Sequence, residues 1–415
     1  MTGRPSSPTF TVGAERINIT PTDLAGLNPM DGRAFRGVHD PIHARVIVLQ
    51  LGREVTAFVS IDAIEVGNMD AERQRIARET GVAADHVMIT ATHDHSAPRL
   101  GRVTPGALAH PGGPEVDAYT SAVIGKVIDG IRAARAHAVP ARYGTGEGHA
   151  DVNVNRDEYT ARGWTIGFDP DGPSDKTVHV IRFDDLSGRT IAAIVNYPVH
   201  ANVMLGTDLL SGDLTGAAAG FVENTLGGGA IVAFAQSTIG DQAPRLFTPG
   251  AKQDGVKAEA AWHEADTQGT MLGGEVLRVI GRISDMREAG LLAAANRTFA
   301  CPVKAGVDVM ADMHQEPVSS VPIRLSLIRL DDVALGGVSG EVLTAIGTKL
   351  RASSPLRQTL LVSLVNDRVG YLPPDSDYDR PTFEVKGSPV QRGCAEPGIV
   401  EGLVAMIRQT DRQEN

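Results

Sequence analysis

The chain has 415 residues, of which 42% are hydrophobic and 21% are charged, with 46 Gly and 24 Pro. This composition is ordinary for a turn-rich globular enzyme and excludes the fibrous and disordered classes. A formal net charge of −11 gives no long-range attraction for nucleic acid or anionic lipid, so we expect neither as a partner. No apolar stretch approaches the roughly 18 residues that a membrane span requires.

The N-terminal sequence MTGRPSSPTFTVG has no charged region followed by an apolar region, as a secretion signal would. We therefore expect a cytoplasmic protein with a disordered tail over residues 1–9. The two cysteines, Cys301 and Cys394, lie far apart without CxxC spacing. This spacing indicates neither a disulfide framework nor a cysteine zinc site, and it favours two buried free thiols.

The first third of the chain is rich in strand-like segments, and a short turn at 52–54 predicts a hairpin. These segments are expected at 10–20, 43–51 and 55–64. They are followed by a helix over 69–80, a buried strand over 86–93 and a long helix over 115–138.

Strands and helices then alternate. Strands are predicted at 178–184, 191–199 and 230–237, helices near 214–226 and 255–283, a β-rich stretch at 302–338, and a helix after Glu341. This order predicts an α/β fold, with a single large layered domain of mixed sheet and helices over 10–415. No linker or internal repeat divides the chain.

The sharpest local motif is THDHSAP at 92–98, where the buried strand ends. Ligands bind at strand ends in α/β sheets. On an extended backbone His93 and His95 point to the same side, which suits a metal ligand beside an acid/base group. The alternative is a pair of surface or hydrogen-bonded core histidines, so other segments must decide.

Several other predicted strand and helix ends place polar side chains at their boundaries. They are His200, Ser211 with Asp213, Ser237 with Asp241, Glu341, and the segment 366–371. Taken alone, the second is a helix N-cap and the third is turn chemistry. Convergence of two histidines from two strand ends would form a site.

In this order the motifs resemble those of the neutral/alkaline (non-lysosomal) ceramidases, over nearly the whole chain. Six segments are each similar to one family pattern: residues 92–98 to Thr-His-Thr-His-Ser-Gly-Pro, 199–201 to Val-His-Pro, 211–213 to Ser-Gly-Asp, 234–237 to Phe-Ala-Gln-Ser, 339–343 to Pro-Gly-Glu-Phe-Thr, and 366–371 to Asn-x-Tyr-x-x-Tyr. The likeness is to the catalytic N-terminal domain, without the C-terminal β-sandwich of larger ceramidases.

The resemblance implies a zinc ion (Zn²⁺) held by His93, His200, Glu341 and Tyr371. Two imidazoles and a carboxylate are the usual protein ligands of a catalytic zinc, whereas a phenol is an unusual fourth ligand. Tyr378 is the alternative source of that phenol. The resemblance also suggests a hydrogen bond from Asp62 to a ligand histidine, and it places His39 in a segment similar to a family core element.

The resemblance implies a hydrolase that cleaves a linear N-acyl amide by attack of a metal-bound water. His95 or Asp241 would deprotonate the water, and Arg156 would face the substrate carbonyl. The chain departs from the family pattern at Ala243, where the family has serine, and at Phe383, where it has tyrosine. The second departure removes one candidate oxyanion donor.

Other functions remain open at this point. The same zinc site can serve an ester or lactone hydrolase, and the two departures motivate a non-catalytic binding protein on the same scaffold. A serine hydrolase using Ser96 or Ser237 lacks the Gly-x-Ser-x-Gly elbow. We expect a small-molecule amide or ester as the partner, and the sequence leaves a homo-oligomer possible.

Overall fold

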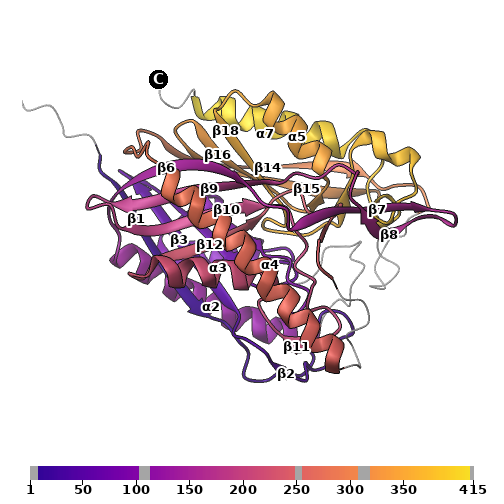
Figure 1. Cartoon of the computed structure of the whole chain (residues 1–415). Helices are drawn as coiled ribbons and strands as arrows, with labels where there is room; N and C mark the ends of the chain where they lie inside the picture. The colour runs from indigo at the N-terminus through magenta and orange to yellow at the C-terminus, as the bar shows by residue number, and fades with distance from the viewer. Residues whose placement is uncertain (1–7, 102–112, 248–254, 307–317, 412–415) are drawn as a thin grey trace, which may run out of the picture.

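The computed structural model describes residues 8–101, 113–247, 255–306 and 318–411 (Figure 1). Residues 1–7 of the predicted disordered tail lie outside this range. The described residues form layers of sheets and helices, as the sequence predicts.

The largest layer is a mixed eight-stranded sheet. In spatial order its strands are β12 (Ile231–Gln236), β10 (Thr190–Tyr197), β9 (Thr177–Asp185), β6 (Val139–His149), β1 (Phe10–Asn18), β3 (His43–Leu51), β4 (Glu54–Ile61) and β5 (Val87–Ala91). The β12–β10 and β4–β5 pairs are parallel and the other neighbours are antiparallel. Strands β3, β4, β5, β10 and β12 are buried on both faces over most of their length, as expected of a sheet covered on each side, whereas β1 and β6 also carry exposed residues.

A second sheet of four strands packs against the first. Its order is β14 (Leu292–Pro302), β15 (Ser320–Leu330), β16 (Val333–Val338) and β18 (Gln358–Val362). One core cluster lies between the sheets, where Phe58 and Ile194 of the large sheet meet Ile328 and Leu360 of the small one.

Helices cover the two outer faces, which gives four layers (Figure 1). The large sheet is covered by α2 (Pro114–Ala136), α3 (Asp213–Leu226) and α4 (Gly255–Arg282), with α1 (Asp70–Thr80) beside α2. The small sheet is covered by α5 (Thr344–Ser353) and α7 (Ala395–Asp411). Among the described residues, no helix is both long and apolar enough to cross a membrane.

Short elements lie at the ends of the strands. A hairpin of β7 (Asn153–Thr160) and β8 (Gly163–Asp169) extends away from the layers and pairs with β13 (Gln242–Pro244) (Figure 1). The remaining pieces are β2 (Gly37–Val38), β11 (Leu209–Leu210), β17 (Glu341–Val342), β19 (Tyr371–Leu372), the short helix α6 (Phe383–Gly387), and 3-10 turns at Ala84–His86 and Asp375–Asp379.

Most predicted elements agree with the observed ones within a few residues, including the hairpin of β3 and β4. The β-rich stretch predicted at 302–338 begins ten residues earlier, with β14, and α7 is not predicted. No element is predicted from the sequence over 139–169, where β6, β7 and β8 form, because glycine and polar residues interrupt the alternation there. The pairing of these strands is decided by tertiary contacts, which strand propensity does not report.

The prediction of two free thiols is wrong. Cys301 on β14 and Cys394 just before α7 form a disulfide, with their Cα atoms 5.7 Å apart. The bond joins the small sheet to the helix that covers it. Sequence spacing could not predict it, because the two residues meet only when α7 packs on the sheet.

Candidate active site

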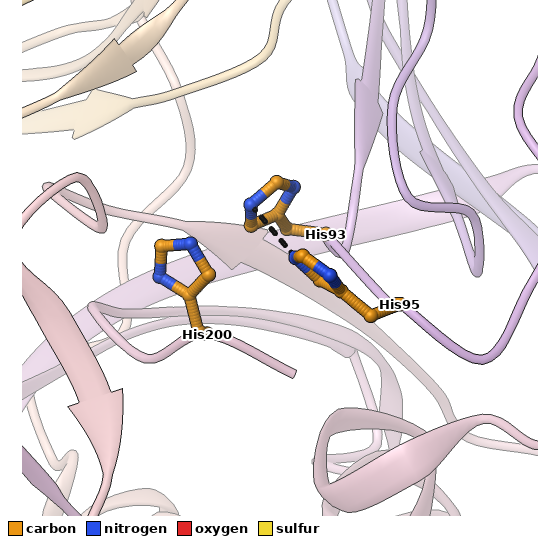
Figure 2. A group of neighbouring side chains, drawn as sticks. All are labelled: His93, His95 and His200. Carbon is orange, nitrogen blue, oxygen red and sulfur yellow. Dashed lines mark hydrogen bonds between the residues drawn. The ribbon is translucent and has the colours of Figure 1, made fainter. Parts of the chain in front are cut away.

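Three histidines converge where two strands end. His93 and His95 follow β5, and His200 follows β10. The two loops are joined by a parallel bridge between Asp94 and Ala201, and the His95 amide donates to the Ala201 carbonyl at 2.8 Å. Figure 2 shows the three rings turned toward one another, with one ring nitrogen from each within 4.8 Å of the others. The group could hold a metal ion.

The backbone at His93 differs from the extended conformation expected from the sequence. Its φ is +59°, in the left-handed region that non-glycine residues rarely adopt. The side chains nevertheless converge, because Nε2 of His93 lies 3.3 Å from Nε2 of His95. Such conformations occur where the surrounding structure holds them, often at functional sites.

Hydrogen bonds determine which ring nitrogen can bind a metal. Nδ1 of His93 donates to the Ile64 carbonyl at 2.7 Å, and Nδ1 of His200 donates to the Gln242 carbonyl at 2.8 Å. A neutral imidazole that donates from Nδ1 has its lone pair on Nε2. Both rings therefore present acceptor atoms to the site, the arrangement found in metal-ligating histidines.

Glu341 at the start of β17 supplies a carboxylate to the same point. Its Oε2 lies 3.3 Å from Nε2 of His93 and 3.5 Å from Nε2 of His200, and all three side chains are buried. Three acceptor atoms so close repel one another unless a cation lies between them. Ligands about 2.0–2.2 Å from a tetrahedral zinc are separated by about 3.3–3.5 Å, so the spacing fits this ion.

The electrostatics keep His95 and His200 neutral. Burial, with the neighbouring charge of Arg156 and the adjacent His93 ring, lowers the pKa of His200 to about 3. Burial and the other two histidines lower the pKa of His95 well below its usual value. Burial opposes ionisation of Glu341, but His93, His200 and Arg368 outweigh it and hold the pKa of that carboxyl well below its usual range. Neutral imidazoles and an ionised carboxylate are the forms that bind metals.

Tyr371 lies beside this group and Tyr378 does not contact it. Strands β17 and β19 pair Glu341 with Tyr371, whose ring is 5.5 Å from the Arg156 guanidinium carbon. Burial and the Glu341 charge raise the pKa of Tyr371. The Tyr378 hydroxyl donates instead to the Val390 carbonyl at 2.9 Å. Of the two candidate phenols, the structure therefore places Tyr371 near the carboxylate.

Arg156 on β7 also reaches the site. Its Nε donates to Oε1 of Glu384 at 2.7 Å, and its Nη1 donates to Nε2 of His200 at 3.1 Å. A metal ion at His200 would replace this second hydrogen bond. The guanidinium would then be free to donate to a substrate oxygen while Glu384 holds it in place.

Asp241 and Asp62 do not contact the histidines. The Asp241 carboxylate accepts from the amide and hydroxyl of Thr344 at 3.1 and 2.7 Å and from Asn155 at 3.4 Å. Asp62 accepts from the His43 amide at 2.8 Å and from Arg45 at 3.2 Å. The expected bond from Asp62 to a ligand histidine is absent, because backbone carbonyls orient His93 and His200 instead. His39 lies apart, bonded to Asp40.

A family model described as "Neutral/alkaline non-lysosomal ceramidase, N-terminal" matches residues 19–320. The chain belongs to this family. The matched range includes the three histidines and Arg156, whereas Glu341 and Tyr371 lie beyond it.

Curated ceramidases are similar in sequence to part of this chain. Neutral ceramidase A of Dictyostelium discoideum is 29% identical over 53% of this chain and 33% of its own length. The neutral ceramidase of Drosophila pseudoobscura pseudoobscura is 28% identical over 61% of this chain and 39% of its own. The chain thus spans between a third and two fifths of these relatives.

The fold is also that of solved ceramidases. The crystal structure of neutral ceramidase from Pseudomonas aeruginosa matches with a TM-score of 0.77 and 18% identity, over 97% of this chain and 75% of that one. A structure described as "Ceramidase complexed with C2" gives the same TM-score at 17% identity. At these identities the match establishes the shared fold.

The departures from the ceramidase pattern are placed near the site. Ala243 on β13 pairs with Val154 of β7, two residues before Arg156. Phe383 packs edge-on against Tyr371, with ring centroids 5.7 Å apart, and lies 5.9 Å from the Arg156 guanidinium. Phe383 keeps the aromatic contact but has no hydroxyl to donate.

The buried charged residues around the ligand candidates are not predicted from the sequence. Arg368 contacts Glu341, and Glu384 contacts Arg156. The only sequence signal was their proximity to matched segments, since Arg368 lies within 366–371 and Glu384 follows Phe383.

Proposed function

We propose that the protein is a zinc-dependent hydrolase that cleaves a linear N-acyl amide. Ceramidases are hydrolases of amide bonds, and the chain belongs to that family. The observation that supports the proposal most strongly is the convergence of Glu341 Oε2 with the Nε2 lone pairs of His93 and His200. This donor set suits zinc.

A bound zinc ion would act as a Lewis acid that polarises a carbonyl and lowers the pKa of a water molecule to roughly 7. His93, His200 and Glu341 would hold the ion, with Tyr371 as the fourth candidate ligand. Their rigid hydrogen bonds to backbone and to Arg368 keep the ligand atoms in place before the ion arrives.

His95 is the proton-transfer group in this proposal. Its lowered pKa leaves it neutral at physiological pH, and one of its ring nitrogens lies within 4.8 Å of a ring nitrogen of each of the other two histidines. His95 accepts a proton from the attacking water as the water oxygen forms a bond to the carbonyl carbon. It then donates that proton to the amide nitrogen as the carbon–nitrogen bond breaks, which yields a carboxylic acid and an amine.

Arg156 stabilises the negative charge that develops on the carbonyl oxygen. Its Nη1 already points to His200, and its ion pair with Glu384 fixes the guanidinium. Because Phe383 has no hydroxyl, Arg156 provides a larger share of this stabilisation than in ceramidases that have a tyrosine there.

The test compares hydrolysis of a short-chain N-acyl sphingosine with that of a matched ester, using zinc-loaded wild type and His95→Ala. We expect amide cleavage that a chelator abolishes. The variant should retain zinc and lose about 10²–10⁴-fold in kcat. Faster ester cleavage would favour the ester hydrolase, and zinc binding without turnover of either substrate would favour the binding scaffold. Loss of zinc in His95→Ala would make His95 a metal ligand.

A further inference from the structure

A chain of four buried charged side chains begins at Glu341 and leads away from the histidines. Arg368 Nη2 donates to Glu341 Oε1 at 2.9 Å, and Arg368 Nε lies 3.0 Å from Glu65 Oε2. Arg99 Nη2 lies 2.7 Å from Glu65 Oε1. The exposed fractions are 0% for Glu341, 4% for Arg368, 2% for Glu65 and 1% for Arg99. Burying four charges costs several kcal/mol per ion before pairing, so stability alone is a weak reason for the arrangement.

Arg368 acts on one oxygen of Glu341 only. It binds Oε1, while Oε2 faces His93 and His200. A carboxylate held through one oxygen presents the other in a fixed direction. Without the guanidinium, Glu341 could rotate and offer either oxygen to the site.

The segment Ile64–Glu65 orients two ligand candidates at once. The Ile64 carbonyl accepts from Nδ1 of His93, and the Glu65 carboxylate holds Arg368, which in turn holds Glu341. The segment is itself fixed, because the Ile64 amide donates to Pro98 and the Leu100 amide donates to the Glu65 carbonyl. One short segment thus orients both the His93 imidazole and the Glu341 carboxylate.

We infer that Arg368 and Glu65 are positioning residues that direct Oε2 of Glu341 toward the metal ion. The inference rests on the proposed function. Its consequence is that zinc affinity depends on two side chains that do not touch the ion. Partners of this kind typically change metal affinity by about 10–100-fold when they are replaced.

The experiment measures zinc affinity by competition with a chromophoric chelator in wild type, Arg368→Gln, Arg368→Lys and Glu65→Gln. Arg329→Gln is the matched control, because Arg329 on β15 is also buried, with 7% exposure against 4% for Arg368, and pairs with Asp411 at the end of α7 instead of with a candidate ligand. We expect affinity to fall about 10–100-fold in Arg368→Gln and less in Arg368→Lys, whose ammonium keeps the charge but not the forked geometry. Glu65→Gln should fall between wild type and Arg368→Gln.

Thermal unfolding of the metal-free proteins shows which variants are folded, and only folded variants are scored. If Arg368→Gln is unfolded, Arg368→Lys and Glu65→Gln decide the question. Wild-type affinity in the variants, with zinc bound by the wild type, would overturn the inference and leave the proposed function intact. An equal loss in Arg329→Gln would show a general effect of removing a buried arginine and would also overturn it. Absence of zinc binding in the wild type would overturn both.

Discussion

His93 and His200 are oriented in the same way, although they follow different strands. Each donates a hydrogen bond from Nδ1 to a backbone carbonyl. Each also turns Nε2 toward Oε2 of Glu341, which lies 3.3 Å from Nε2 of His93 and 3.5 Å from Nε2 of His200. The protein therefore holds three acceptor atoms against one another before any ion is added.

The two candidate phenols give a direct comparison. Tyr371→Phe should weaken zinc binding and lower kcat/KM by about tenfold or more, because Tyr371 is paired with Glu341 across β17 and β19. Tyr378→Phe should leave both unchanged and cost about 1 kcal/mol of stability, since its hydroxyl bonds to Val390 and Ser388 and not to the site. Chelator competition and denaturant unfolding separate the two effects. The reverse pattern would make Tyr378 the site residue.

Asp241 is expected to be structural. Burial raises its pKa to about 6, and both its oxygens are used by Thr344 and Asn155. Asp241→Ala should lose about 1–3 kcal/mol of stability, because Thr344 loses its acceptor. Asp241→Asn keeps an acceptor and should retain kcat within about tenfold. A loss of about 10²-fold or more in Asp241→Asn, with the fold intact, would make Asp241 the general base.

Asp157, next to Arg156, should make stability decrease with pH. Burial and a hydrogen bond with Glu384 raise the pKa of Asp157 to about 9. Between about pH 4 and pH 9 the native state keeps this proton and the unfolded state has lost it, so the free energy of unfolding falls as pH rises. Asp157→Asn should remove this slope, which urea unfolding at several pH values measures. An unchanged slope in the variant would assign the dependence to other groups.

The disulfide should stabilise the packing of α7 against β14. It closes a loop over a sequence separation of 93 residues, for which chain entropy predicts about 4–5 kcal/mol. The Cys301→Ala/Cys394→Ala variant should therefore unfold at a markedly lower temperature than the oxidised wild type. Equal melting temperatures would show that the bond is not formed.

The same bond bears on location. Disulfides persist mainly in oxidising compartments, whereas the sequence predicts a cytoplasmic protein. The cytoplasmic location stays a prediction. Cell fractionation combined with thiol labelling of Cys301 and Cys394 tests it, since a cytoplasmic chain should label at both positions.

Much of the fold and part of the site could be predicted from the sequence. Strands β3, β4, β5, β10 and β12 are continuous apolar segments, and the histidines follow two of them. The prediction that strand-end residues converge is met by His93, His95, His200 and Glu341.

The remaining features depend on contacts between distant segments. The left-handed φ of His93 occurs where the next residue, Asp94, forms a bridge with the distant Ala201, and no local pattern reports it. Arg368 and Glu65 are ordinary charged residues in the sequence and become a buried pair only in the fold. The disulfide likewise requires α7 to be in place.

The most direct test of the central claim is the metal content of the purified protein by plasma emission, beside a His93→Ala/His200→Ala variant. The account predicts one zinc per wild-type chain and none in a variant that remains folded by circular dichroism. Absence of metal from a wild-type chain incubated with zinc, or full retention in the variant, would contradict the assignment of the site.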